Sequence, residues 1–365
     1  MTDWFSIYWG VAAMLLPFYV RFNEHNDVRI CKNLFFFFLV CVSLIVFGLG
    51  KRKVSLGLKT SLVFLAILSF FNHKNLYLSA AIEQTIIFNI SLVILYQLLT
   101  FNLDFVVIAF FLRISALIQA VIFILNYYGV NPYNLSLPAP IPYGSFGQQT
   151  LSGAHIAVLF PLFLQTWWWM FIPVLIVAVF LAKSAMAWAS LVAGVVVFGC
   201  YKHIKRPLFV SGCFCSALIA FFLTKSIPFF SDNMRYVTWK KLMIEFFNWR
   251  WIEELFGRGL GWLFHNSRLE DGIGGIFTYA HNEAIDSLWA FGIIGTSVIV
   301  YVLLKALKNI NEGSRVSLAI LAAFISNSFG NFTFHISAIA LPAMLAYAYL
   351  VTNNEEKINY GYNGY

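Results

Sequence analysis

The sequence predicts an all-α fold, a polytopic integral membrane protein of about twelve transmembrane helices. Two observations predict it. Of the 365 residues, 60% are hydrophobic and only 11% are charged, whereas about a quarter of the residues in a soluble domain are charged. In addition, apolar runs long enough to cross a hydrocarbon core of about 30 Å recur along the whole chain. We therefore expect residues 1–365 to form a single multi-pass membrane domain.

The expected spans are apolar runs of about 16–25 residues, separated by short polar loops except at two places. The spans are expected near 4–20, 33–50, 54–71, 76–100, 104–126, 151–166, 167–182, 184–200, 207–224, 283–305, 316–333 and 335–351.

Basic residues in short loops orient these spans, because cytoplasmic loops carry an excess of Lys and Arg. When the spans alternate, Lys51–Lys53, Lys202–Arg206 and Lys305–Arg315 fall on one side together with both termini. That side is the expected cytoplasmic side. The same bias accounts for the net charge of +8 without a nucleic-acid ligand. Two longer loops, 127–150 and 225–282, then emerge on the outer face.

The two outer loops differ in composition. The first is rich in Pro, Gly and Ser and carries no charge, which favours extended, turn-rich backbone. In the second, Tyr236–Phe247 and Trp249–Phe256 alternate aromatic and charged residues, a pattern typical of short amphipathic helices on a membrane surface. Indole rings prefer headgroup depth, which is the expected position of Trp239, Trp249, Trp251 and Trp262.

The second outer loop also collects cations, among them Arg235, Arg250 and Arg258. A guanidinium pairs bidentately with phosphate oxygens, so the set favours a phosphate or diphosphate ligand. For each arginine, the alternative is contact with lipid headgroups or an ion pair with an acidic residue of the same loop, namely Glu245, Glu253, Glu254, Glu270 or Asp271.

His281 ends this loop, directly before Asn282 and Glu283 open the next span. Imidazole titrates near neutral pH and can take a proton from a hydroxyl group. The alternative is a hydrogen-bonding histidine at the membrane boundary. Weaker candidates for the same role are His73, His155, His265 and His335.

Three ionisable residues, Glu83, Arg113 and Lys183, fall inside or at the ends of expected spans. Such residues are costly in lipid and usually face a partner or a water-filled cavity. Lys183 is expected at the outer end of a helix pair, where a phosphate contact would fit. For Arg113, a structural ion pair and a functional role both stay open.

The order of these pieces resembles the O-antigen ligase and O-antigen polymerase family of membrane glycosyltransferases. The resemblance covers about the C-terminal two-thirds of the chain, and its most specific piece is the His-Asn pair that opens a helix ending in Gly-Ile-Ile-Gly. The matching segments are PYGSFGQQTLSGAHIAVLFPL, AKSAMAWASLVAG, Arg235 with FGRGLGWLF, and AHNEAIDSLWAFGIIG.

The resemblance implies an inverting glycosyltransferase that needs no metal or other cofactor and works on the outer face of the bacterial inner membrane. Its donor would be an undecaprenyl-diphosphate-linked glycan, and its acceptor another glycan or a lipid core. By motif, Arg235 and Lys183 would hold the diphosphate, and His281 would orient or deprotonate the acceptor hydroxyl. Further candidates for substrate binding are Arg250, Arg258 and Asn282.

Two other functions remain open at this point. A transporter or flippase of a lipid-linked saccharide would line its pathway with Glu83, Arg113 and Lys183. The absence of a visible internal repeat disfavours this alternative, because many transporter folds contain repeats. A non-catalytic scaffold would instead bind a partner through the aromatic loop and tolerate Arg→Lys changes.

Overall fold

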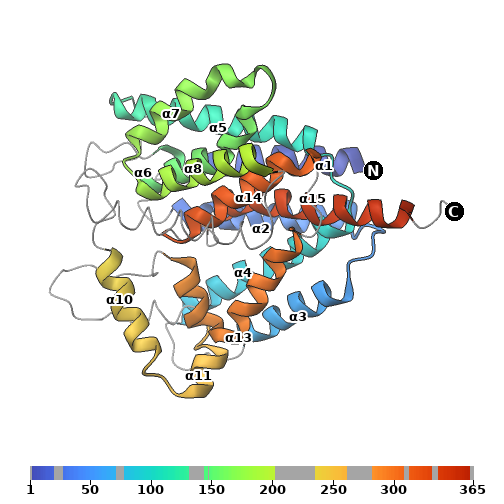
Figure 1. The fold of residues 1–365 in the computed structure, drawn as a ribbon, viewed down its shortest axis with the longest axis vertical. Helices are drawn as coiled ribbons and strands as arrows, with labels where there is room; N and C mark the ends of the chain where they lie inside the picture. Colours follow the sequence, from blue (N-terminus) through green and yellow to red (C-terminus); the bar gives the residue numbers. More distant parts are fainter. Residues whose placement is uncertain are drawn as a thin grey trace.

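The computed structural model describes residues 2–19, 28–70, 78–130, 144–146, 148–201, 235–260, 282–307, 312–330 and 336–361. Within these ranges the protein is all-α, which confirms the predicted class (Figure 1). The N-terminal part consists of α1 (Thr2–Leu15), η1 (Leu16–Phe18), α2 (Val28–Phe47), α3 (Leu56–Phe70), α4 (Leu78–Thr100) and α5 (Phe105–Tyr127).

The central part begins with η2 (Gly144–Phe146) and α6 (Gln149–Leu159). It continues through η3 (Phe160–Leu164), η4 (Thr166–Phe171), α7 (Ile172–Leu181) and α8 (Ala185–Cys200). The predicted amphipathic segments are helices, α10 (Arg235–Phe246) and α11 (Trp251–Phe256). The C-terminal part consists of α13 (Glu283–Lys305), η6 (Glu312–Ser314), α14 (Arg315–Ser328) and α15 (Ser337–Gly361).

The described helices therefore coincide with the expected spans, apart from 207–224, which lies outside the described residues. Among the residues that the structure describes, α5 and α13 alone are both long and apolar enough to cross a bilayer by themselves, and eight further apolar helices are 10–17 residues long. Local interruptions explain several of the short helices. For example, Pro161 turns the end of α6 into the 3₁₀ helix η3, because proline removes a backbone donor.

The helices alternate in direction, so both termini lie at one end of the bundle (Figure 1). Contacts fix this end. Arg52 donates to the Asn102 Oδ1 atom (3.0 Å) and to the carbonyl of Thr352 near the C-terminus. At the same end of the bundle, Arg315 donates to the carbonyl of Phe198 (2.6 Å), where α8 ends. The basic residues of two short loops thus lie at the same end as the termini.

The opposite end of the bundle carries the last residues of α5, the corner between α7 and α8, and the first residues of α13 (Figure 1). One large apolar core joins α1–α8, the later part of α13, α14 and α15. Two smaller clusters lie apart from it, one beneath α10 and one between α3, α13 and the turn after α11. These smaller clusters attach the second outer segment to the bundle.

Candidate functional site

Helix α13 begins at Glu283, directly after the His281-Asn282 pair singled out in the sequence. The Asn282 Oδ1 atom accepts hydrogen bonds from the backbone N–H groups of Ala284 (3.0 Å) and Ile285 (3.3 Å). An Asn in this position satisfies donors that a helix start leaves unpaired. Asn282 therefore has a structural task as N-cap, and its contact with substrate stays a prediction. His281 lies outside the described residues.

Helix α13 is broken at Gly292, whose φ of 64° and ψ of −168° are not helical. This conformation is essentially restricted to glycine. The turn that follows α11 docks at the break. The N–H of Arg258 donates to the carbonyl of Trp289 (2.8 Å), and the N–H of Gly259 donates to that of Ala290 (3.0 Å).

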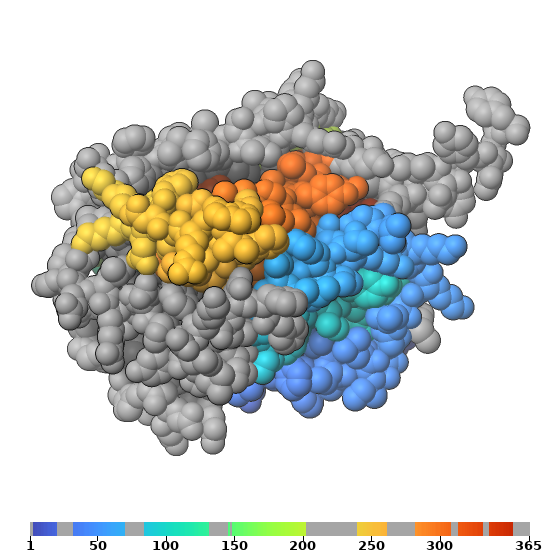
Figure 2. Space-filling view, turned by 90° about the horizontal axis from the view of Figure 1, so that it is seen from below, coloured from blue at the N-terminus to red at the C-terminus, as the bar shows by residue number. Residues whose placement is uncertain are grey.

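The two backbones meet at a pair of glycines. A Cβ atom added to Gly292 would stand 2.5 Å from the nitrogen of Gly257, and one added to Gly257 would stand 2.5 Å from the nitrogen of Phe291. No side chain fits on either side of this contact. Figure 2 shows residues 239–260 (yellow) lying against α13 (orange), with α3 (blue) beside them.

Tryptophans hold α10 onto α13. The ring of Trp249 stands at 74° to that of Trp289, with centroids 4.6 Å apart, and both side chains are buried. Phe246 of α10 packs on Trp249 at 5.0 Å. The Trp249 ring thus fills the interface with α13, and its expected headgroup depth stays a prediction. Trp251, by contrast, is 70% exposed.

Arg258 forms an ion pair within its own loop, which is the alternative that the sequence left open beside phosphate binding. Its Nη2 and Nε atoms donate to the Glu253 Oε2 atom at 2.8 and 3.2 Å, and its guanidinium lies 4.0 Å from the centroid of the Trp249 ring. Burial acts to raise the pKa of Glu253, but the hydrogen bond and charge of Arg258 outweigh it, helped by Arg250, and leave this pKa lowered. The binding of diphosphate by Arg258 stays a prediction.

The other predicted cations lie on exposed positions or outside the described atoms. The side chain of Arg250 is exposed and does not cap α11, although its carbonyl accepts from Glu253 (2.8 Å) and Glu254 (3.1 Å). Arg235 is the first residue of α10, and its side chain lies outside the described residues. The structure therefore gathers Arg250, Arg258 and Asn282 on one packed unit of α10, α11 and α13.

Lys183 lies on a separate corner, between α7 and α8, where it is exposed and has a φ of 46°. Ser184 caps α8 by accepting from the N–H of Ala187 (3.3 Å). The corner packs closely on α6, because a Cβ atom added to Gly153 would stand 2.6 Å from the Ala182 Cβ atom. Lys183 thus shares the end of the bundle with the start of α13 but belongs to another group of helices (Figure 1).

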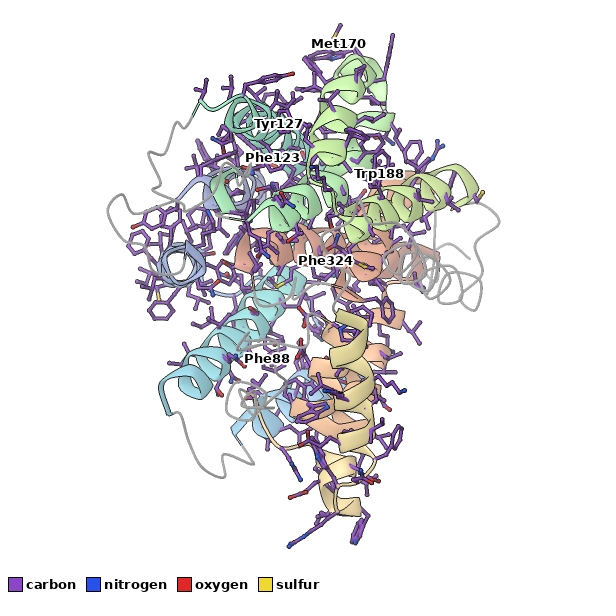
Figure 3. The ribbon with its side chains drawn as sticks, turned by 90° about the vertical axis from the view of Figure 1, so that its left-hand side faces the viewer. Phe88, Phe123, Tyr127, Met170, Trp188 and Phe324 are labelled. Atoms are coloured by element: carbon purple, nitrogen blue, oxygen red, sulfur yellow. The ribbon has the colours of Figure 1, made fainter. Side chains whose placement is uncertain are left out.

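A cavity of about 170 Å³ lies beside the start of α13, between α3, α4, α13, α14, α15 and the turn after α11. Its walls are mainly aliphatic and aromatic. Figure 3 labels two of the lining side chains, Phe88 on α4 and Phe324 on α14. Lipid-like or aromatic groups suit such walls.

Polar side chains line the same cavity. Glu283 and Asp286 lie one helical turn apart on α13 and are only 6% and 8% exposed, and Gln84 of α4 is 8% exposed. Asp286 and Gln84 are not among the site residues predicted from the sequence. Two acidic residues at i and i+3, at the start of an apolar helix, are the sequence signal that could have found them.

A second buried polar cluster lies between α2, α5 and α6. Lys32 is 1% exposed, donates to the carbonyls of Pro17 and Tyr19 (the latter at 3.3 Å) and lies 5.1 Å from the centroid of the Phe146 ring. His155, a weaker candidate in the sequence, is also buried, and its Nε2 atom lies 3.2 Å from the Ser115 hydroxyl. Lys32 thereby ties α2 to the end of η1, and the Ser115–His155 contact joins α5 to α6, so the cluster has a structural explanation.

No protein-family model matches this chain, and no curated protein sequence is significantly similar to it.

Proposed function

We propose that this chain is a polytopic inner-membrane glycosyltransferase of the O-antigen ligase or polymerase kind. It transfers a glycan from an undecaprenyl-diphosphate carrier to an acceptor hydroxyl on the outer face of the membrane, with inversion and without a metal ion. The one observation that carries the proposal is the packing of the basic segment α10–α11 onto the capped start of α13, beside an apolar cavity.

Exposed apolar side chains support the membrane location. Leu34, Phe38 and Ile45 of α2 are 63%, 58% and 84% exposed, and their spacing puts them along one side of the helix. On α5, Val106 and Phe110 are likewise exposed. Each such side chain left in water forgoes about 1.5–3 kcal/mol of burial energy. Lipid removes this cost, and large exposed apolar patches are rare on soluble monomers.

The charge distribution supports the proposed orientation and site. Arg52 and Arg315 lie at the end of the bundle that holds both termini, which the positive-inside rule assigns to the cytoplasm. The second outer segment then faces the periplasm with Arg250 exposed. Since cations are matched to the growing charge of a diphosphate leaving group, this is where the donor headgroup would bind.

The proposed reaction is a single displacement. The acceptor oxygen forms a bond to the anomeric carbon while its proton passes to a base, for which His281 is the candidate. The bond between the anomeric carbon and the diphosphate oxygen breaks, and its electron pair leaves with the carrier. Arg235 and Lys183 are the candidates that stabilise this leaving charge, assisted by Arg250.

The transporter alternative requires Arg113, Glu83 and Lys183 along one pathway. Arg113 instead donates to the carbonyl of Leu162 (3.0 Å), and its guanidinium lies 5.5 Å from the centroid of the Trp168 ring. The same side chain is only 9% exposed. These contacts favour a structural role for Arg113, so they weigh against the transporter.

Complementation of a deletion strain tests the proposal. Arg235→Ala and His281→Ala, expressed at wild-type levels, should each lower surface-glycan attachment, the arginine variant by about 10²–10³-fold in transfer rate. Arg235→Lys should not restore full activity, because lysine loses bidentate pairing. Lys305→Ala, at the far end of α13, is the matched control. Unchanged glycan length and attachment in both alanine variants would rule the proposal out.

The same deletion strain separates the two reactions. Loss of all attached glycan on a gel identifies a ligase, because no chain then reaches its acceptor. Attachment of single repeats identifies a polymerase, because only chain growth is lost.

A further inference from the structure

The cavity beside α13 combines two kinds of hydrogen-bonding groups. Glu283 and Asp286 contribute carboxylates, which only accept hydrogen bonds when ionised. Their spacing of three residues puts both on one side of α13, and both side chains are more than nine-tenths buried. Any ligand that approaches them must therefore present hydrogen-bond donors.

A polar side chain without a hydrogen bond lines the same cavity. Gln84 is 8% exposed and makes no hydrogen bond with the described residues. Buried polar groups are nearly always hydrogen-bonded, so Gln84 points to a missing partner, and its amide can both donate and accept.

Ligand chemistry follows from this combination. A phosphate or diphosphate presents only acceptors, and ionised carboxylates have no proton to donate to it. An ammonium group presents only donors and would leave the Gln84 amide N–H without an acceptor. Hydroxyl groups both donate and accept, so a sugar suits the carboxylates and the Gln84 amide together. Aromatic walls, including Phe88 and Phe324, suit the apolar face of a pyranose ring.

Size agrees with one ring. A cavity of about 150 Å³ is known to hold a benzene molecule, and this cavity measures about 170 Å³. The remaining walls, from α3, α14 and α15, are mainly apolar.

We infer that this cavity binds the sugar end of a hydroxyl-bearing acceptor, with Glu283, Asp286 and Gln84 as its hydroxyl-binding residues. The site for the acceptor is thereby separate from the cations that bind the diphosphate donor. Asn282 follows His281 directly in the sequence, so the candidate base adjoins this site along the chain. The acceptor role rests on the proposed function, whereas the binding of a sugar rests on the cavity alone.

Binding of radiolabelled octyl β-glucoside to the full chain in phosphatidylcholine nanodiscs tests the inference. We expect saturable binding that octyl phosphate, with the same alkyl chain, does not compete away. Glu283→Gln, Asp286→Asn and Gln84→Leu should each weaken it by about 10- to 100-fold, the effect of losing a strong hydrogen bond. Ala343→Phe fills the cavity and should abolish binding. Glu254→Gln, on α11 outside the cavity, is the matched control and should bind as wild type.

Equal competition by octyl phosphate would overturn the inference, because the cavity would then accept an anion. The inference would also be overturned if both Ala343→Phe and the milder Gln84→Leu bind the glucoside as tightly as the wild type. The proposed function fails separately. If Arg235→Ala and His281→Ala leave surface glycan unchanged while the cavity variants lose glucoside, the sugar site stands without the transferase. If glycan attachment needs Arg235 and His281 but the cavity variants bind glucoside as the wild type does, only this inference fails.

Discussion

Replacing Gly292 by alanine tests how the basic outer segment is attached to the bundle. The φ of 64° at Gly292 lies where an L side chain costs about 1–3 kcal/mol. The new Cβ atom would also stand 2.5 Å from the Gly257 nitrogen, so the two backbones must separate. Separation breaks the hydrogen bonds of Arg258 and Gly259 to α13, worth about 0.5–1.5 kcal/mol each. The sum is roughly 2–6 kcal/mol against the docked segment.

Limited trypsin digestion in detergent measures this change. The exposed Lys240, Lys241 and Arg250 become cleavable when α10 and α11 detach, and the lower bound of the cost corresponds to about a 30-fold larger open population. Gly199→Ala is the control, because a Cβ atom there meets nothing within 4 Å. If Gly292→Ala is cleaved at the wild-type rate, the glycine contact does not hold the segment.

Two further predictions concern single contacts. Glu253→Gln should lower stability at neutral pH by less than about 1 kcal/mol, because the pair with Arg258 is partly exposed. Since folding lowers the pKa of Glu253, the wild-type advantage is complete above the ordinary value of 4.5 and disappears as pH falls through the lower folded value. Thermal unfolding of both proteins across this range checks the sign, and an advantage that grows on acidification would contradict it. Arg113→Ala should cost about 1.5–3 kcal/mol, the worth of a charged hydrogen bond, in the same thermal unfolding assay. Loss of transport with unchanged stability would instead assign Arg113 to a pathway.

Helix positions could be predicted from the sequence because they depend on local properties. Apolar runs separated by polar loops gave α5 and α13 nearly residue for residue. The alternation of aromatic and charged residues gave α10 and α11 in the same way.

Partners across the fold could not be predicted in this way. Trp249 has the composition of a headgroup anchor, yet it is buried because Trp289 lies opposite it in space. Arg258 has the chemistry of a phosphate ligand, yet Glu253 and the Trp249 ring already engage it. The type of a residue limits what its side chain can bind, whereas the neighbouring side chains determine what it does bind.

By itself the sequence determined that the chain is helical and rich in membrane-length apolar runs, and that several of its arginines lie in the second long loop. Hydrophobicity and charge are properties of single residues, so they can be read from the sequence without the tertiary structure. The tertiary structure decided that Gly257 and Gly292 bring α11 onto a broken α13, and that Glu283, Asp286 and Gln84 share one cavity. Gln84 lies about two hundred residues from the two acids. No local pattern links residues at that separation, because their proximity results from the packing of α4 against its neighbours.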